Sequence, residues 1–203
     1  MHKLCVVIPM KDPAFSKQRL SPHLPASVRK ALAIKLFKKT VVSLNGSFPQ
    51  WQKLVVTPSL YIADLATSLG CKVIFEAKGS NLNTALAQAT EWSMSKGFSH
   101  QLILPADIAR LEEKELNSIA ALASGDTSVV IGSAYDGGTN ALCTTPPNAI
   151  DFAFGKSSSY EHHQAAMEKG LKCVTVQPQY LSQDIDHPDD LRHVNDVVDS
   201  LIA

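Results

Sequence analysis

The sequence predicts an α/β fold built on a doubly wound, mostly parallel sheet with helices on both faces. Short apolar runs alternate along the chain with longer segments of helical periodicity, which is the pattern of repeated β-α-β units. The chain has 203 residues and contains no repeat and no linker-like stretch. That length suits one domain and is short for two.

Each predicted strand is a short apolar run, and in chain order these runs cover residues 4–8, 54–56, 71–75, 101–104, 128–131, 141–144 and 173–176. Each predicted helix carries apolar residues on one face, and these segments cover residues 27–44, 60–69, 82–96, 112–123, 157–169 and a stretch after Pro188. We expect Ser27 to cap the first helix and Gly46 to end it, because these residue types favour those positions. The fixed φ of Pro188 suits the first turn of the last helix.

The composition excludes several classes of partner. Nineteen basic residues balance nineteen acidic ones, which argues against a nucleic-acid-binding protein or a polybasic membrane anchor. No apolar run is long enough to span a bilayer, and the opening run is too short for a secretory signal. The four cysteines have no CxxC spacing, so we expect reduced, buried thiols rather than a zinc site. These features predict a cytoplasmic protein.

In a doubly wound sheet the ligand crevice lies beyond the carboxyl ends of the strands. The segment after the first predicted strand carries Lys11, Lys17 and Arg19 within nine residues, between prolines and without helical periodicity. A loop there would bring three cations over the crevice, where they could neutralise a triphosphate. The alternative interpretation is a solvated basic loop.

Carboxylates follow two other extended segments. Asp107 comes directly after the strand at 101–104, where it could bind Mg²⁺ or instead cap a turn. Asp184 and Asp186 alternate in an extended segment and would share one side, an arrangement that favours a cation near them. Asp189 and Asp190 follow Pro188 in the first helical turn, so we interpret them as structural.

A polar, glycine-containing region completes the set of candidates. Thr139 and Asn140 follow paired glycines, and Ser158 follows Gly155 at the predicted start of a helix, whose amino end attracts phosphate. Residues 155–157 are similar to the end of a Walker A loop, but Ile150 stands where that motif requires glycine, so we reject it. The adjacent residues His162 and His163 cannot share one helical face as metal ligands, and we expect both at the surface.

Together these stretches resemble the 2-phospho-L-lactate guanylyltransferase family, whose members serve the biosynthesis of the deazaflavin coenzyme F420. The resemblance runs in register from Pro9 to Leu191. It is carried by Pro9-Met10-Lys11 with Ser16-Lys17-Gln18-Arg19-Leu20, Leu82-Asn83 with Ala85-Leu86, Pro105-Ala106-Asp107, Gly138-Thr139-Asn140-Ala141-Leu142, Phe152-Ala153-Phe154-Gly155 with Ser158, and Asp184-Ile185-Asp186 before Pro188.

The resemblance implies one three-layer, Rossmann-like nucleotidyltransferase domain over residues 1–203, with a mostly parallel mixed sheet. It implies transfer of GMP from GTP to a small phosphorylated carboxylic acid, with release of pyrophosphate. Lys11, Lys17 and Arg19 would hold the GTP phosphates, and Asn83 with its neighbours would lie near guanine. Asp107 and Asp186, helped by Asp184, would bind Mg²⁺. The resemblance also implies a binding site for the acceptor, formed by Thr139, Asn140, Gly155 and Ser158.

Some positions depart from the family pattern. Members often continue with Asp-Leu-Pro where this chain has Asp107-Ile108-Ala109, which leaves the acceptor open among 2-phospho-L-lactate, phosphoenolpyruvate and 3-phospho-D-glycerate. Two other functions also stay open: another nucleotidyltransferase or a glycosyltransferase of the same fold, and a catalytically silent nucleotide-binding module. The oligomeric state is open as well, with a homodimer as one option.

Overall fold

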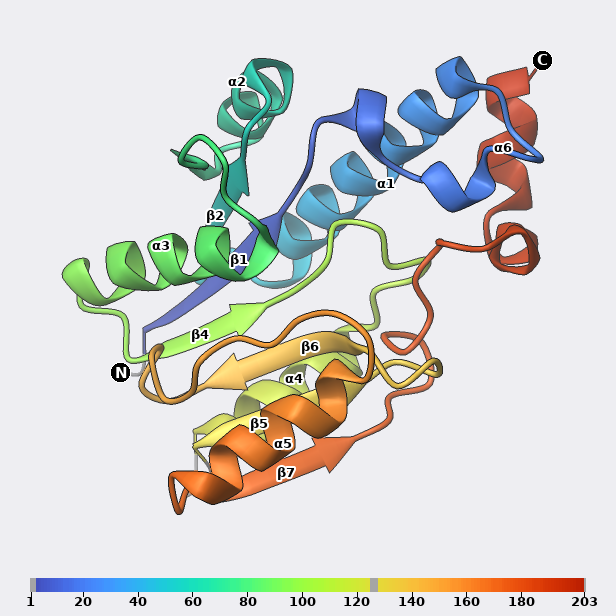
Figure 1. Cartoon of the computed structure of the whole chain (residues 1–203). Helices are drawn as coiled ribbons and strands as arrows, with labels where there is room; N and C mark the ends of the chain where they lie inside the picture. The colour runs from blue at the N-terminus through green and yellow to red at the C-terminus, as the bar shows by residue number, and fades with distance from the viewer. Residues whose placement is uncertain (1–2, 125–127, 203) are drawn as a thin grey trace.

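The computed structural model describes residues 3–124 and 128–202, and for residue 202 it describes only the backbone. The ends of the predicted domain, 1–2 and 203, and its residues 125–127 lie outside the described residues. Within them the chain forms a seven-stranded sheet in the order β3-β2-β1-β4-β6-β5-β7 (Figure 1). The strands are β1 Leu4–Pro9, β2 Gln52–Thr57, β3 Lys72–Phe75, β4 His100–Ile103, β5 Val129–Ser133, β6 Thr139–Thr144 and β7 Cys173–Val176.

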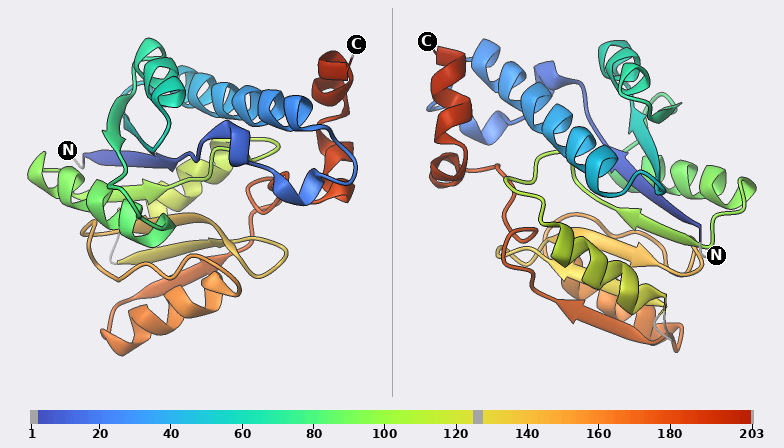
Figure 2. Two further views of the ribbon diagram at one scale, coloured as in Figure 1. Left: turned by 45° about the horizontal axis from the view of Figure 1, so that its top comes forward. Right: turned by 180° about the vertical axis from the view of Figure 1, so that it is seen from behind.

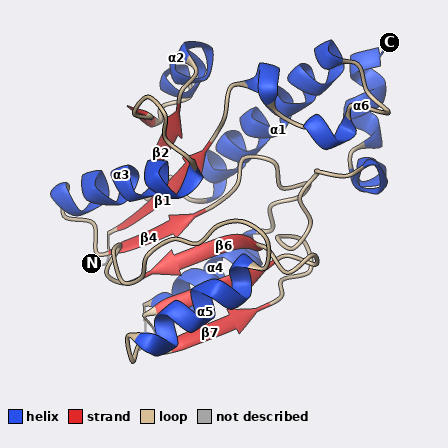
Figure 3. Ribbon diagram, viewed as in Figure 1, coloured by secondary structure: helices blue, strands red, loops and turns tan. Residues whose placement is uncertain are grey.

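The sheet is mixed, with one reversed strand. β6 pairs antiparallel with both of its neighbours, β4 and β5, whereas the other paired strands run parallel. The predicted α/β fold with a mostly parallel mixed sheet is therefore confirmed. Figure 3 shows the central strands side by side with helices around them.

Helices cover both faces of the sheet (Figure 2). They are α1 Ala26–Ser47, α2 Leu60–Ser68, α3 Leu82–Ser95, α4 Glu113–Ala123, α5 Ser158–Glu168 and α6 Asn195–Ile202. Alternate residues of β1 divide between two apolar cores, as the two-residue period of a strand requires. Val6 packs with residues of α1, α2 and α4, and Val7 packs with residues of α3 and α5. The molecule thus has three layers.

The predicted end of the chain is wrong in one respect. The segment after Pro188 forms a six-residue 3₁₀ helix, Pro188–His193, and α6 begins only at Asn195. The Asp190 carboxylate accepts the backbone N–H groups of Asp186 at 3.0 Å and His187 at 2.6 Å, which holds this segment in a tight turn. A structural role for Asp190 is what the sequence predicted. Val194 and α6 then pack against the first turns of α1.

Two predicted helix ends also differ. α1 begins after Pro25, so Ser27 lies inside the helix, and it runs through Gly46 to Ser47. The buried residues of α1 include Leu44, near the end of the apolar face, so packing against the sheet outweighs the low helix propensity of one glycine.

The cysteines are free thiols, as predicted. Cys5, Cys71 and Cys143 are buried and Cys173 is half-buried. Burial raises the pKa of the Cys5 and Cys71 thiols to about 11. Among the helices of the described residues, none has the length and hydrophobicity that crossing a bilayer requires.

Candidate active site

A cavity of about 640 Å³ opens at the carboxyl ends of the central strands. Its walls come from the loop after β1, the segment after β3, the first turn of α3, the loop after β4 and the segment at 184–186. These segments are far apart in sequence. They meet because β1 and β4 are parallel neighbours in the middle of the sheet, so the loops after both strands emerge on the same side.

The three predicted cations, Lys11, Lys17 and Arg19, all line this cavity. The loop that carries them contains two short 3₁₀ turns, and Asp12 stabilises the first by accepting the N–H of Ala14 at 2.9 Å. Lys17 lies between the turns in the left-handed region, with φ of 56°. Its side chain is 4% exposed, so Lys17 is not part of a solvated basic loop.

The three predicted carboxylates line the same cavity. Ile108 and Asp184 form an antiparallel bridge, and the Ile185 N–H donates to the Asp107 carbonyl at 3.1 Å. This short backbone pairing fixes the segment at 184–186 beside the loop after β4. Asp107 and Asp186 are therefore on one side of the molecule, within one cavity.

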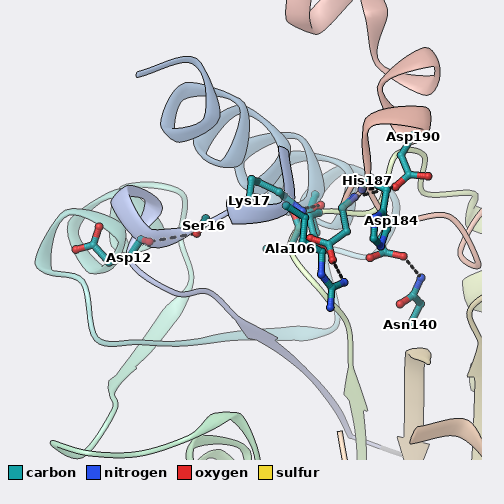
Figure 4. A network of polar contacts seen from close by, with 12 residues as sticks. Asp12, Ser16, Lys17, Ala106, Asn140, Asp184, His187 and Asp190 are labelled. Atoms are coloured by element: carbon teal, nitrogen blue, oxygen red, sulfur yellow. Dashed lines mark hydrogen bonds and ion pairs between the residues drawn. The ribbon is translucent and has the colours of Figure 1, made fainter. Parts of the chain in front are cut away.

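Each of two carboxylates forms an ion pair with a cation of the loop after β1. Lys17 pairs with Asp107, and the more exposed Arg19 pairs with Asp186. The Asn140 amide donates to Asp184 Oδ1 at 3.1 Å, and Figure 4 shows this bond. Burial and the nearby charge of Asp107 raise the pKa of Asp184. Positive and negative side chains thus converge on one solvent-accessible space.

The donor set fits a hard divalent cation in its chemistry, because three carboxylates supply the oxygen ligands that Mg²⁺ prefers. The carboxylates are not clustered as a preformed metal cage. Over residues 3–124 and 128–202, no three acidic, histidine or cysteine side chains are grouped tightly enough to hold an ion. Instead, Lys17 and Arg19 act as counter-ions to Asp107 and Asp186.

The residues implied for the acceptor lie next to this cavity rather than along its walls. Thr139 and Ser158 are buried, and Ser158 Oγ donates to Thr139 Oγ1 at 3.1 Å. Asn140 reaches the cavity through its bond to Asp184. Gly155 has φ of 150°, and the residue before it, Phe154, forms part of the cavity wall.

Asn83, implied near guanine, binds the protein backbone instead of facing the cavity. Its Oδ1 accepts the Phe154 N–H at 2.8 Å and its Nδ2 donates to the Phe154 carbonyl at 3.3 Å. Ser80, Asn81 and Leu82 line the cavity at the start of α3. Leu82 is one of the neighbours of Asn83 that the resemblance placed near guanine, whereas Ser80 and Asn81 were not singled out from the sequence. A signal was present, because Asn81 and Thr84 have the spacing of a capping box that marks a helix start.

His162 is fully buried, so its predicted surface position is wrong. It lies on the inner face of α5, together with Ser158, Ser159 and Ala166. The spacing of Ser158, His162 and Ala166 is one helical turn each, which could have indicated a shared face. The surface expectation followed from the adjacency of His162 and His163, which excluded a shared metal-binding face, but a histidine with neutral partners can be buried.

The sequence is similar to those of known guanylyltransferases. A family model described as "Guanylyl transferase CofC like" matches residues 4–195. A 3-phospho-D-glycerate guanylyltransferase from Colwellia psychrerythraea is 45% identical over 186 residues, which are 92% of this chain and 88% of that protein. A 2-phospho-L-lactate guanylyltransferase from Methanothermobacter thermautotrophicus is 32% identical over 95% of this chain and 84% of its own length.

Solved structures share the fold at low sequence identity. A nucleotidyl transferase from a Methanothermobacter species superimposes with a TM-score of 0.68 at 16% identity, over 98% of this chain and 99% of that one. A CMP:2-keto-3-deoxy-manno-octonic acid synthetase gives a TM-score of 0.62 at 10% identity, over 98% of this chain and 99% of that one. The fold is that of nucleotidyltransferases, and the chain belongs to the CofC-like guanylyl transferase family.

Proposed function

We propose that the enzyme joins GMP from GTP to a small phosphorylated carboxylic acid and releases pyrophosphate, as a step in coenzyme F420 biosynthesis. One observation carries the proposal: cations from the loop after β1 and carboxylates from two other segments meet in one cavity. That combination suits a reaction between two anions, which repel each other until positive charge lies between them.

The reaction is an in-line attack by a phosphate oxygen of the acceptor on the α-phosphorus of GTP. The oxygen–phosphorus bond to the acceptor forms as the bond to pyrophosphate breaks. The acceptor phosphate is already ionised near neutral pH, so the protein supplies no nucleophile. Catalysis of such transfers depends mainly on positioning the reactants and on neutralising their charge. In this proposal the triphosphate is bound and neutralised by Lys11, Lys17 and Arg19.

Asp107, Asp186 and Asp184 are the residues that would hold Mg²⁺, since their oxygens face the same cavity as the cations. When bound, the ion supplies further neutralisation of the phosphate oxygens. In this assignment Lys17 and Arg19 leave the carboxylates and bind the nucleotide phosphates.

3-Phospho-D-glycerate is the first acceptor to test, because the relative with 45% identity is named for that substrate. Thr139, Asn140, Gly155 and Ser158 would form its site, beside the cavity wall at Phe154. We also propose that the enzyme acts in the cytoplasm, where free thiols such as those of its four cysteines persist.

The experiment is a matrix of four nucleoside triphosphates against three acceptors, 3-phospho-D-glycerate, phosphoenolpyruvate and 2-phospho-L-lactate, each with Mg²⁺. Pyrophosphate release is measured and the product is identified by mass. We expect a GMP adduct of one acceptor, formed from GTP in preference to CTP, ATP and UTP. Transfer from CTP in preference to GTP would contradict the proposal, as would tight GTP binding with no product from any acceptor.

A further inference from the structure

His162 is a buried polar side chain that the proposed chemistry leaves unused. Its ring makes two polar contacts and one aromatic contact. Nε2 lies 3.0 Å from the Ala153 backbone nitrogen and Nδ1 lies 3.1 Å from Thr139 Oγ1. The Phe154 ring packs edge to face, with the ring centroids 4.7 Å apart. All three partners are neutral. The ring is fully buried, so these contacts are not shared with bulk solvent.

These contacts define the protonation of the ring. Because Nε2 accepts the Ala153 N–H, it carries a lone pair, and a neutral imidazole must then carry its proton on Nδ1. Nδ1–H therefore donates to Thr139 Oγ1, which also shares a hydrogen bond of 3.1 Å with the Ser158 hydroxyl. The two hydroxyls carry two hydrogens and use one between them, so while His162 donates to Thr139 the other hydrogen is left to act as a donor.

The same ring also holds one wall of the cavity. Two successive backbone N–H groups of this wall are held by side chains: His162 accepts the Ala153 N–H, and Asn83 accepts the Phe154 N–H. Phe154 lines the cavity, and Thr139 immediately precedes Asn140, which donates to Asp184. His162 thus connects the cavity wall at Phe154 to β6. That strand carries Asn140, which donates to the cavity carboxylate of Asp184.

We propose that His162 is a positioning residue, which leaves the paired hydroxyls of Thr139 and Ser158 as a hydrogen-bond donor toward the anionic acceptor and holds the 153–154 wall beside them. The inference rests on the proposed function and assigns a second layer of residues behind its acceptor site. An ionised phosphate or carboxylate oxygen only accepts hydrogen bonds, so a hydroxyl pair that is held as a donor is complementary to it.

Two substitutions separate the two halves of this role. In His162→Asn the amide nitrogen takes the place of Nδ1 and keeps the donor to Thr139, but nothing accepts the Ala153 N–H. In His162→Gln the amide oxygen reaches the place of Nε2 and keeps that acceptor, but the donor to Thr139 is lost. The neighbouring His163 is half-buried, so His163→Asn and His163→Gln are matched controls on the same helix.

We expect His162→Gln to raise the KM for the acceptor about tenfold, the effect of losing one well-placed hydrogen bond, with the KM for GTP changed less. We expect His162→Asn to recover most of the acceptor affinity and to lower the Tm instead. The His163 variants should match wild type in both KM values. The proposal is overturned if Asn impairs acceptor binding more than Gln does, or if both variants leave the acceptor KM unchanged.

A measurement on the wild-type protein tests the tautomer without any turnover. Long-range ¹H–¹⁵N correlation spectra of the histidine rings distinguish a protonated Nδ1 from a protonated Nε2. We expect Nδ1 to carry the proton of His162, with the resonance assigned by its loss in His162→Asn. A proton on Nε2 would overturn the inference. Absence of guanylyl transfer in the wild type would instead contradict the proposed function, so the two failures are distinguishable.

Discussion

At the scale of single residues, the ion pair between Lys17 and Asp107 joins the two halves of the proposed chemistry. Lys17 is nearly buried and Asp107 is about one-third exposed, so the pair is partly shielded from water. Breaking such a pair from either side leaves a charge without its counter-ion, which is costly in a shielded site. Replacing Asp107 and replacing Lys17 should nevertheless have different functional consequences.

Asp107→Ala removes a proposed Mg²⁺ ligand. We expect kcat to fall by a factor on the order of 10² or more, the size of effect seen when a group that stabilises charge in the transition state is removed. Asp184 remains near Lys17, so the fold should persist, with a circular dichroism spectrum like that of wild type. Steady-state kinetics with GTP and Mg²⁺ measure the loss, and activity close to wild type would refute the role of Asp107.

Lys17→Ala removes a cation that the enzyme would use for the triphosphate. We expect the dissociation constant for GTP to rise about tenfold or more, since a charge-assisted hydrogen bond contributes about 1.5–3 kcal/mol. Titration calorimetry measures that constant. The control is Lys30→Ala, which removes an exposed lysine of α1 and should leave GTP affinity unchanged. Equal affinities for the two variants would argue against the placement of GTP at this loop.

His162 adds a pH-dependent contribution to stability. Burial lowers its pKa from 6.5 to about 4, so the unfolded chain binds a proton below pH 6.5 while the folded protein does not until pH 4. The free energy of unfolding therefore falls as pH drops through this window, by about 3 kcal/mol in total, and the loss levels off below pH 4. Urea unfolding between pH 7 and pH 4 measures it, and His162→Asn should show a smaller loss.

At the scale of elements, the tight pairing of β5 with β6 depends on Gly132. A Cβ atom at this position would lie 2.9 Å from the Ala141 Cβ, closer than two carbon side chains approach, and the register of the pair shifts beside it. The absence of a side chain allows the antiparallel strand to reach full contact at the start of β6, where Thr139 and Asn140 lie.

Gly132→Ala should therefore destabilise the protein by about 1–3 kcal/mol, the cost of overpacking a buried site. Gly46→Ala is the control, because Gly46 lies inside α1 with open space around it, and alanine favours a helix there. Thermal unfolding of both variants compares them. If Gly132→Ala were as stable as Gly46→Ala, the strand contact would not limit the side chain at position 132.

At the scale of the whole molecule, one sheet unites the two large apolar cores. Because alternate residues of the central strands belong to opposite cores, neither core can lose its packing without disturbing the sheet between them. We expect a single cooperative unfolding transition, with calorimetric and van't Hoff enthalpies in agreement. Two resolved transitions would contradict the prediction of one domain over the chain.

The alternation of strands and helices predicted the fold, and it also predicted part of the convergence of charges. Lys17 and Asp107 come after strands of the sheet, and the rule that ligands bind beyond the carboxyl ends of strands places them together. The place of Asp186 beside them was implied by the family resemblance, and in the structure it depends on the backbone pairing of Ile108 with Asp184. His162 could not be placed in this way. Its partner Thr139 is 23 residues away on another element, and local periodicity carries no information about such a contact.

The strand order also has a consequence for synthesis on the ribosome. Residues 4–103 supply β1 to β4, one contiguous half of the sheet, and residues 129–176 supply the other half. The nascent chain exposes the loop that carries Lys11, Lys17 and Arg19 early, whereas the acids at positions 184 and 186 emerge after the seven strands of the described sheet. An unfinished polypeptide would therefore carry the cations proposed for GTP before the acids proposed for Mg²⁺, and under the proposed function we expect turnover only after residues 184–186 have emerged.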